Sequence, residues 1–213
     1  MRLEVESTAG VSLLSLAYNL RQKAIVPVGA LFSNIGYVLL DRDGVINRKP
    51  REGEYVGHWR EFQLLPGVES AITALNRSGR RVLVVTNQRG IALGLYSCAD
   101  VEDTHARLRS HLADYGAHID GIYFCPHDKD QCTCRKPKTG LFEQALRDFP
   151  ELLVGEGIVI GDSLSDIEFA RNLGLPSIFI QGEPDRQSPG AEQASSFGDA
   201  VAGSLLEAVE KYL

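Results

Sequence analysis

Two aspartates one residue apart, Asp41 and Asp43, directly follow a short apolar run in the sequence. The run Tyr37 to Leu40 has the length and composition of a buried strand, and Gly44 indicates a turn after the acids. Acids in this position lie at the carboxyl edge of a sheet, where open α/β folds keep their sites. One carboxylate can attack as a nucleophile while the other moves a proton, and both can help to hold a hard cation. A surface turn rich in aspartate is the alternative interpretation of this segment alone.

A second polar segment, Thr86-Asn87-Gln88-Arg89-Gly90, also follows a predicted strand. It combines a hydroxyl, two amides, a guanidinium and a glycine turn. These groups supply hydrogen-bond donors and positive charge, which favour binding of phosphate oxygens. The alternative is an ordinary polar loop between a strand and a helix.

A third acidic position, Asp162, ends another predicted strand. It could join Asp41 on a magnesium ion, which prefers carboxylates, water and substrate phosphate as ligands. Asp166 lies one helical turn into the next helix. Its carboxylate either contacts the residues that bind the metal, without binding the metal itself, or simply stabilises a helix N-terminus.

Three cysteines and one histidine lie within ten positions of one another, in residues 125–134. Their number and type match a closed structural zinc site formed by Cys125, His127, Cys132 and Cys134. A local disulfide is the alternative, but cysteines separated by one residue pair with strained geometry. Cys98 lies outside the group and is predicted to be a small buried residue.

A basic run, Arg135-Lys136-Pro137-Lys138, comes directly after this cluster. Zinc would fix the loop and with it the direction of Arg135 and Lys136. A lysine near the acids would neutralise charge on phosphate and carboxylates together. A solvated surface run is the alternative.

Strands and helices alternate along the chain, which predicts an α/β fold with a parallel sheet covered on both faces. Strands are predicted over residues 37–40, 81–86, 119–124, 157–161 and 176–180. Helices are predicted over residues 68–77, 100–115, 139–149, 163–173 and 199–213. Residues 182–196 are predicted to form a polar loop. Residues 1–34 stand apart as an N-terminal extension, helical over 11–23 or partly disordered. Residues 35–213 are predicted to form a single domain.

The composition is that of an ordinary globular protein: 213 residues, 44% hydrophobic and 23% charged. The net charge of -6 gives no electrostatic case for binding nucleic acid or an anionic membrane. No apolar run approaches the roughly 18 residues that span a bilayer, and the N-terminus does not read as a signal peptide. The bunched cysteines favour a reducing, cytoplasmic location. We expect a monomer that acts on a small metabolite, with a dimer as the alternative.

The order of these motifs resembles the haloacid dehalogenase (HAD) superfamily of phosphatases. The segment Asp41 to Asn47 resembles the first motif of the family, and Thr86-Asn87 the second. Lys136 resembles the third, and Gly161-Asp162 with Asp166 the fourth. The resemblance spans about residues 37–180 and implies a Rossmann-like HAD fold. No insertion is long enough for a separate cap domain, so the zinc loop and residues 47–60 would shape the mouth of the pocket.

The resemblance implies a mechanism. Asp41 would form an aspartyl-phosphate, and Asp43 would protonate the leaving oxygen and then activate water. Magnesium would be held by the carboxylates of Asp41 and Asp162 and by the backbone carbonyl of Asp43. Further residues are implied in binding. The transferring phosphate would be bound by Thr86, Asn87 and Lys136, and the rest of the substrate by Gln88, Arg89, Gly90, Arg135 and Tyr55.

The zinc loop is shared by two groups of this superfamily, the heptose-bisphosphate phosphatases and the histidinol-phosphate phosphatases. The segment Thr86 to Gly94 and the loop around Tyr55 are similar to the heptose group. Arg89 stands where that group usually has serine, Leu93 where it has arginine, and the zinc loop is short. Because of the similarity in the segment Thr86 to Gly94 and in the loop around Tyr55, we expect heptose 1,7-bisphosphate as substrate, in heptose and cell-surface polysaccharide synthesis. The departures at Arg89, Leu93 and the zinc loop lie in loops that face the substrate. Histidinol phosphate, or a catalytically inactive zinc-stabilised binding domain, is the alternative.

Overall fold

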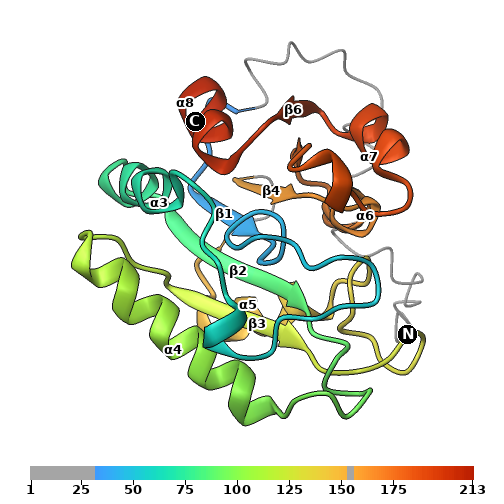
Figure 1. The fold of residues 1–213 in the computed structure, drawn as a ribbon. Coiled ribbons are helices and arrows are strands. Elements are labelled where there is room, and N and C mark those ends of the chain that lie inside the picture. The colour runs from blue at the N-terminus through green and yellow to red at the C-terminus, as the bar shows by residue number, and fades with distance from the viewer. Residues whose placement is uncertain (1–31, 153–155) are drawn as a thin grey trace, which may run out of the picture.

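The computed structural model describes residues 32–152 and 156–213, and within them a six-stranded parallel sheet lies between two layers of helices (Figure 1). The strand order is β3-β2-β1-β4-β5-β6. The first half of the chain builds the sheet outward from β1 in one direction, and the second half builds it in the other. β1 therefore lies where the order reverses, which is the position at which open α/β sheets form their binding crevice.

The strands lie close to the predicted ranges. They are β1 (Tyr37–Leu40), β2 (Arg81–Asn87), β3 (Gly121–Cys125), β4 (Gly157–Gly161), β5 (Ser177–Ile180) and β6 (Ala200–Ala202). The helices are α3 (Val68–Arg77), α4 (Cys98–Asp114), α5 (Gly140–Asp148), α6 (Leu164–Leu173), α7 (Ala191–Phe197) and α8 (Leu205–Tyr212). Two short 3₁₀ turns are η1 (Trp59–Glu61) and η2 (Pro184–Arg186).

Each face of the sheet has its own core because alternate residues of a strand point to opposite faces. In β1, Val38 and Leu40 pack with residues of α3, α4 and α8, whereas Tyr37 and Leu39 pack with residues of α5 and α6. All four residues of β1 are buried, as expected for a central strand covered on both sides. The loops after β1, β2 and β4 are thus held by a rigid core.

The C-terminal part of the chain differs from two predictions. Residues 182–196 are not a plain loop, because they contain η2 and all but the last residue of helix α7, whose Ala191 and Ala194 are buried. Residues 199–213 are not one helix. Ala200–Ala202 pairs with β5 as an edge strand, and α8 begins after Ser204, whose hydroxyl accepts a hydrogen bond from the Glu207 N–H at 3.2 Å.

Cys98 also differs from the prediction, since it is exposed at the first turn of α4. The predicted helix over residues 11–23 and most of the N-terminal extension lie outside the described residues. No helix in the described ranges combines the length and the apolar character needed to cross a membrane.

Candidate active site

The three predicted acids Asp41, Asp162 and Asp166 come together at the carboxyl edge of the sheet. Asp41 follows β1, and Asp162 follows the adjacent strand β4. Each of the three acids offers one carboxylate oxygen, and these oxygens lie within 4.8 Å of one another. All three acids are buried. The parallel pairing of β1 and β4 therefore places side chains from the two halves of the chain at one point.

Lys136 joins the acids as predicted, and it is 3% exposed. Its ammonium lies 2.8 Å from Asp41 Oδ1 and 2.5 Å from Asp166 Oδ1, and it donates to the Val85 carbonyl at 2.6 Å. Burial lowers the pKa of Lys136, but the charges of Asp166 and Asp41 outweigh it and hold the pKa above its usual value. The lysine is therefore charged and is fixed between two carboxylates.

Asp166 stabilises a helix N-terminus, one of the two roles that the sequence left open, and it also pairs with Lys136. Its Oδ2 accepts hydrogen bonds from the Ser163 N–H at 3.1 Å and the Ser163 hydroxyl at 2.5 Å, which stabilises the start of α6. Its other oxygen pairs with Lys136. One carboxylate thus connects the helix terminus to Lys136.

Asp43 is held by a buried network that the sequence did not reveal. The guanidinium of Arg42, which is fully buried, lies 3.0 Å from Asp43 Oδ2 and also donates to the Val56 carbonyl at 2.7 Å. The amides of Asn47 and Gln88 each donate to Asp43 at 2.9 Å. Burial raises the pKa of Asp43, but Arg42 and these amide hydrogen bonds together lower it below its usual value.

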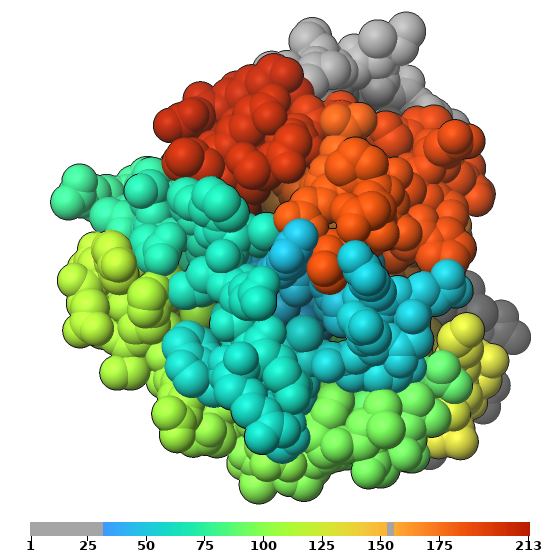
Figure 2. Space-filling view, viewed as in Figure 1, coloured from blue at the N-terminus to red at the C-terminus, as the bar shows by residue number. Residues whose placement is uncertain are grey.

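A cavity of about 300 Å³ opens above these groups. Asp41, Asp43, Thr86, Lys136 and Asp162 line it, as do three of the predicted substrate contacts, Tyr55, Asn87 and Arg135. Figure 2 shows that residues after β1 (blue) lie against residues of the C-terminal third (orange). The other three predicted substrate contacts do not line the cavity.

Gln88, Arg89 and Gly90 lie outside the lining. Gln88 donates a hydrogen bond to Asp43 and accepts one from the Tyr96 hydroxyl at 3.0 Å. Arg89 forms an ion pair with Asp128 of the zinc loop. Gly90 packs on the ring of Tyr96, where a Cβ would approach the ring to 2.3 Å. Their contact with substrate remains a prediction.

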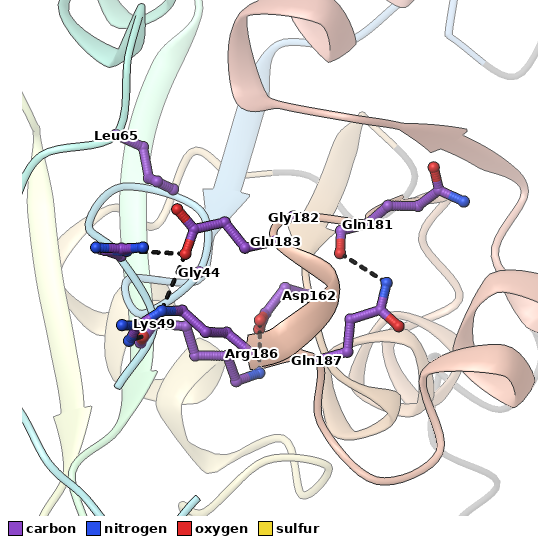
Figure 3. Close-up of a pocket in the computed structure, with 10 residues that line it drawn as sticks. Gly44, Lys49, Leu65, Asp162, Gln181, Gly182, Glu183, Arg186 and Gln187 are labelled. Atoms are coloured by element: carbon purple, nitrogen blue, oxygen red, sulfur yellow. Dashed lines mark hydrogen bonds and ion pairs between the residues drawn. The ribbon is translucent and has the colours of Figure 1, made fainter. Parts of the chain in front are cut away.

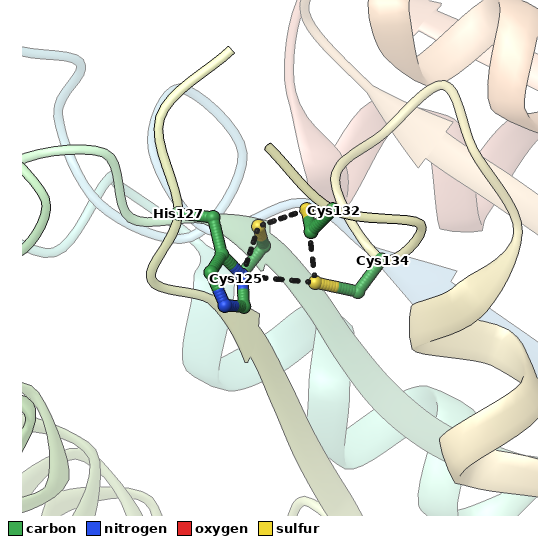
Figure 4. A group of neighbouring side chains, drawn as sticks. All are labelled: Cys125, His127, Cys132 and Cys134. Carbon is green, nitrogen blue, oxygen red and sulfur yellow. Dashed lines mark hydrogen bonds between the residues drawn. The ribbon is translucent and has the colours of Figure 1, made fainter. Parts of the chain in front are cut away.

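The predicted zinc ligands form a compact cluster (Figure 4). The sulfur–sulfur distances are 3.5 Å for Cys125 to Cys132 and 3.3 Å for Cys132 to Cys134. His127 Nδ1 lies 3.7 Å from Cys125 Sγ and 3.4 Å from Cys134 Sγ. A tetrahedral zinc with bonds of about 2.3 Å to sulfur separates its ligands by about 3.7 Å, so these spacings fit the ion. All three thiols are free, which excludes a disulfide in the described structure.

The cluster also positions the basic run that follows it. The Arg135 N–H donates to Cys132 Sγ at 3.3 Å. The side-chain amide of Asn87 both accepts from the Lys136 N–H at 3.0 Å and donates to the Lys136 carbonyl at 3.2 Å. The backbone of Lys136 is therefore fixed by the end of β2 on one side and by the cysteine cluster on the other.

The chain is similar to known proteins in sequence and in fold. A family profile described as HAD-hydrolase-like matches residues 133–208. D-glycero-alpha-D-manno-heptose-1,7-bisphosphate 7-phosphatase from Mycobacterium bovis is 47% identical over 172 residues, which cover 80% of this chain and 84% of the relative. The chain belongs to the HAD-like phosphatases. Members of this family are phosphoric monoester hydrolases.

Two further relatives extend the match. D-glycero-beta-D-manno-heptose-1,7-bisphosphate 7-phosphatase from Pseudomonas putida is 37% identical, over 79% of this chain and 98% of its own. The crystal structure of D,D-heptose 1.7-bisphosphate phosphatase from B. bronchiseptica, complexed with magnesium and phosphate, matches with a TM-score of 0.72 and 29% identity. It covers 83% of this chain and 97% of its own.

The acids of this HAD-like phosphatase fit a divalent cation. Burial raises the pKa of Asp162 to about 7 and that of Asp41 to about 6, although a lysine partially offsets each shift. Asp162 Oδ1 is buried and has no hydrogen-bond partner among the described residues. Closely spaced carboxylates with one unsatisfied oxygen are the donor set that magnesium prefers.

Gly44 allows the loop after β1 to approach Asp162. It has φ +100, and a Cβ on it would lie 2.1 Å from Asp162 Oδ2. We expect Gly44→Ala to displace the Asp162 carboxylate and to reduce kcat by about 100-fold, on the scale of other displaced catalytic groups. Gly53→Ala is the matched control, because Gly53 has φ +85 but no heavy atom of the described residues within 4 Å of its Cβ position. Equal losses of kcat in the two variants would show that backbone strain, not Asp162, is responsible.

Proposed function

We propose that this protein is a magnesium-dependent phosphatase that removes the 7-phosphate of D-glycero-D-manno-heptose 1,7-bisphosphate and leaves heptose 1-phosphate. The observation that carries the proposal is the constellation of Asp41, Asp43, Lys136 and Asp162 around one cavity. The heptose substrate is supported by the relatives at 47% and 37% identity. The relative at 47% identity is named for the alpha anomer, and we propose that anomer as the preferred substrate.

Asp41 is the proposed nucleophile. One of its carboxylate oxygens attacks phosphorus, the bond from phosphorus to the sugar oxygen breaks, and an aspartyl-phosphate forms. Magnesium, held by the Asp41 carboxylate, the Asp43 carbonyl and Asp162, would supply positive charge to the phosphoryl oxygens. Lys136, 2.8 Å from Asp41, supports the ionised nucleophile and the transferring group. Thr86 and Asn87, which line the cavity beside it, are the proposed hydrogen-bond donors to that group.

Asp43 is the proposed proton carrier. It donates a proton to the leaving sugar oxygen and then accepts one from the water that attacks phosphorus, which releases phosphate and restores Asp41. Its low pKa in the free protein favours the ionised form needed in the second step. A bound phosphate dianion adds negative charge nearby and raises this pKa, which favours the protonated form needed in the first step.

Arg135 supports a substrate with two phosphates. It lines the cavity beside Lys136, and its Nη1 is buried without a hydrogen-bond partner among the described residues. A buried guanidinium nitrogen without a partner is costly, and a second phosphate would satisfy it. Arg135 is therefore the proposed contact for the phosphate that is not transferred.

A substrate panel tests the function. We expect kcat/KM with magnesium to be highest for the alpha anomer of heptose 1,7-bisphosphate. It should fall about 100-fold for heptose 7-phosphate, which lacks the group for Arg135, a loss on the scale of an unpaired buried charge. A higher kcat/KM for histidinol phosphate than for either bisphosphate anomer would contradict the proposed substrate. The relatives from Mycobacterium bovis and Pseudomonas putida are both named for heptose 1,7-bisphosphate, not for histidinol phosphate.

Zinc at the Cys₃His cluster is proposed to be structural, since four protein ligands leave no open position. Residues 35–213 are proposed to act as one domain, and the protein as a cytoplasmic monomer.

A further inference from the structure

Lys49, in the loop after β1, contacts the metal-binding acid Asp162 (Figure 3). Its ammonium lies 2.5 Å from Asp162 Oδ2 and donates to the Ser188 hydroxyl at 2.5 Å. The side chains of Lys49 and Asp162 are only 19% and 7% exposed. The mechanism above assigns no role to this lysine, although it lines the same cavity as Asp41 and Asp43.

A group of ion pairs from the segment after β5 holds Lys49 in this position. Arg186 donates to the Lys49 carbonyl at 2.6 Å, and its Nε lies 3.0 Å from Glu183 Oε2. The same Glu183 oxygen lies 2.8 Å from Arg48 Nε. Glu183, Arg186, Lys49 and Asp162 all line one small pocket (Figure 3). The backbone and the ammonium of Lys49 are thus both fixed by residues 183–188.

The two oxygens of Asp162 have different surroundings. Oδ2 is occupied by Lys49, whereas Oδ1 is buried and has no partner among the described residues. A divalent cation can therefore bind Oδ1 while Lys49 stays on Oδ2. The ammonium would then lie near both the metal and the phosphoryl group that the cavity receives.

We propose that Lys49 is a built-in cation of this site, which shares Asp162 with the divalent metal, weakens metal binding and strengthens phosphate binding. The inference rests on the metal site of the proposed function. The physical reason is the sign of the charges: an ammonium repels a divalent cation on the same carboxylate and attracts a phosphate dianion. Because the charge of Lys49 is present with or without the metal, it should affect both the binding of the metal and the binding of phosphate.

Lys49→Gln tests the proposal because glutamine keeps a hydrogen-bond donor near Asp162 but removes the charge. We expect the variant to bind Mn²⁺ about tenfold more tightly, measured by electron paramagnetic resonance on the free protein. We expect the magnesium-loaded variant to bind inorganic phosphate about tenfold more weakly, measured by calorimetry. Lys49→Arg, which keeps the charge, should restore both affinities. Lys211→Gln, at an exposed lysine of α8, is the control for net charge.

Arg186→Gln tests the positioning of Lys49. It should shift both affinities in the same directions by a smaller factor, and it should add nothing in the Lys49→Gln background because it acts through Lys49. Additive effects in the double variant would overturn this part of the proposal.

Unchanged or weaker Mn²⁺ binding in Lys49→Gln, or unchanged phosphate binding, would each overturn the role of Lys49. A wild-type protein that binds no Mn²⁺ would overturn it together with the metal site. Neither measurement uses a sugar substrate. Failure to hydrolyse heptose bisphosphate would therefore leave the test of Lys49 intact.

Discussion

Asp41→Asn is expected to abolish phosphate release, with a loss in kcat of at least about 1,000-fold, because the amide cannot form the phosphoenzyme. The fold should persist, since the substitution keeps the size of the side chain at the end of β1 and removes a charge that is costly to bury. Rapid acid quench followed by mass spectrometry should find one added phosphoryl group on wild-type protein and none on the variant.

Asp114→Asn is the matched control, because Asp114 is an exposed acid at the last residue of α4, on a helix that does not line the cavity. Its turnover should equal that of wild type. If Asp41→Asn kept most of the wild-type turnover with magnesium, the nucleophile would be another residue.

Loss of zinc is expected to have the second large effect. Cys134→Ser should release the ion, lower Tm by about 10 °C or more and reduce kcat/KM by about 100-fold or more, since a structural zinc contributes directly to folding free energy. Activity should fall because Arg135 and Lys136 follow the cluster directly. The N-terminus of α5 also packs against it, since a Cβ on Gly140 would lie 2.9 Å from Cys134 Cα.

Cys98→Ser provides the control, since Cys98 is exposed and lies outside the cluster. It should keep its metal, Tm and activity. Metal analysis of the wild-type protein should find one zinc per chain. Much less than one zinc, with all thiols reactive, would contradict the structural site.

The central residues of the site could be predicted from the sequence because they lie at the carboxyl ends of strands. Once β1, β2 and β4 are recognised as parallel neighbours, their carboxyl ends must meet, which brings Asp41, Thr86 and Asp162 together. The cysteine cluster was predictable for a different reason: its ligands lie in one short loop, so no long-range packing had to be known.

Contacts between distant loops were not predictable in this way. Lys49 and Asp162 are 113 positions apart, and nothing in a charged loop indicates which of its side chains turns inward. The buried position of Arg42 was missed because arginine is normally exposed and its partners lie in separate segments. The ion pair of Arg89 with Asp128 was also not predictable, because it depends on how two loops meet.

The C-terminal errors have local causes. The three-residue strand β6 is too short to show a periodic pattern, and its pairing with β5 overrides the helical character of its alanines. Helix α7 has only 7 residues, and its two buried alanines gave a weak apolar signal.

The central position of β1 has a consequence for the order in which the protein can be built. β1 leaves the ribosome early, but one of its two neighbours, β4, is made more than a hundred residues later. Until then, the apolar strand Tyr37–Leu40 has an open edge of unpaired backbone groups, which can recruit other chains. When β4 is inserted, it closes that edge and delivers Asp162 to Asp41 in the same step. Completion of the sheet and assembly of the candidate active site are therefore one event, and chains truncated before β4 are expected to aggregate as well as to be inactive.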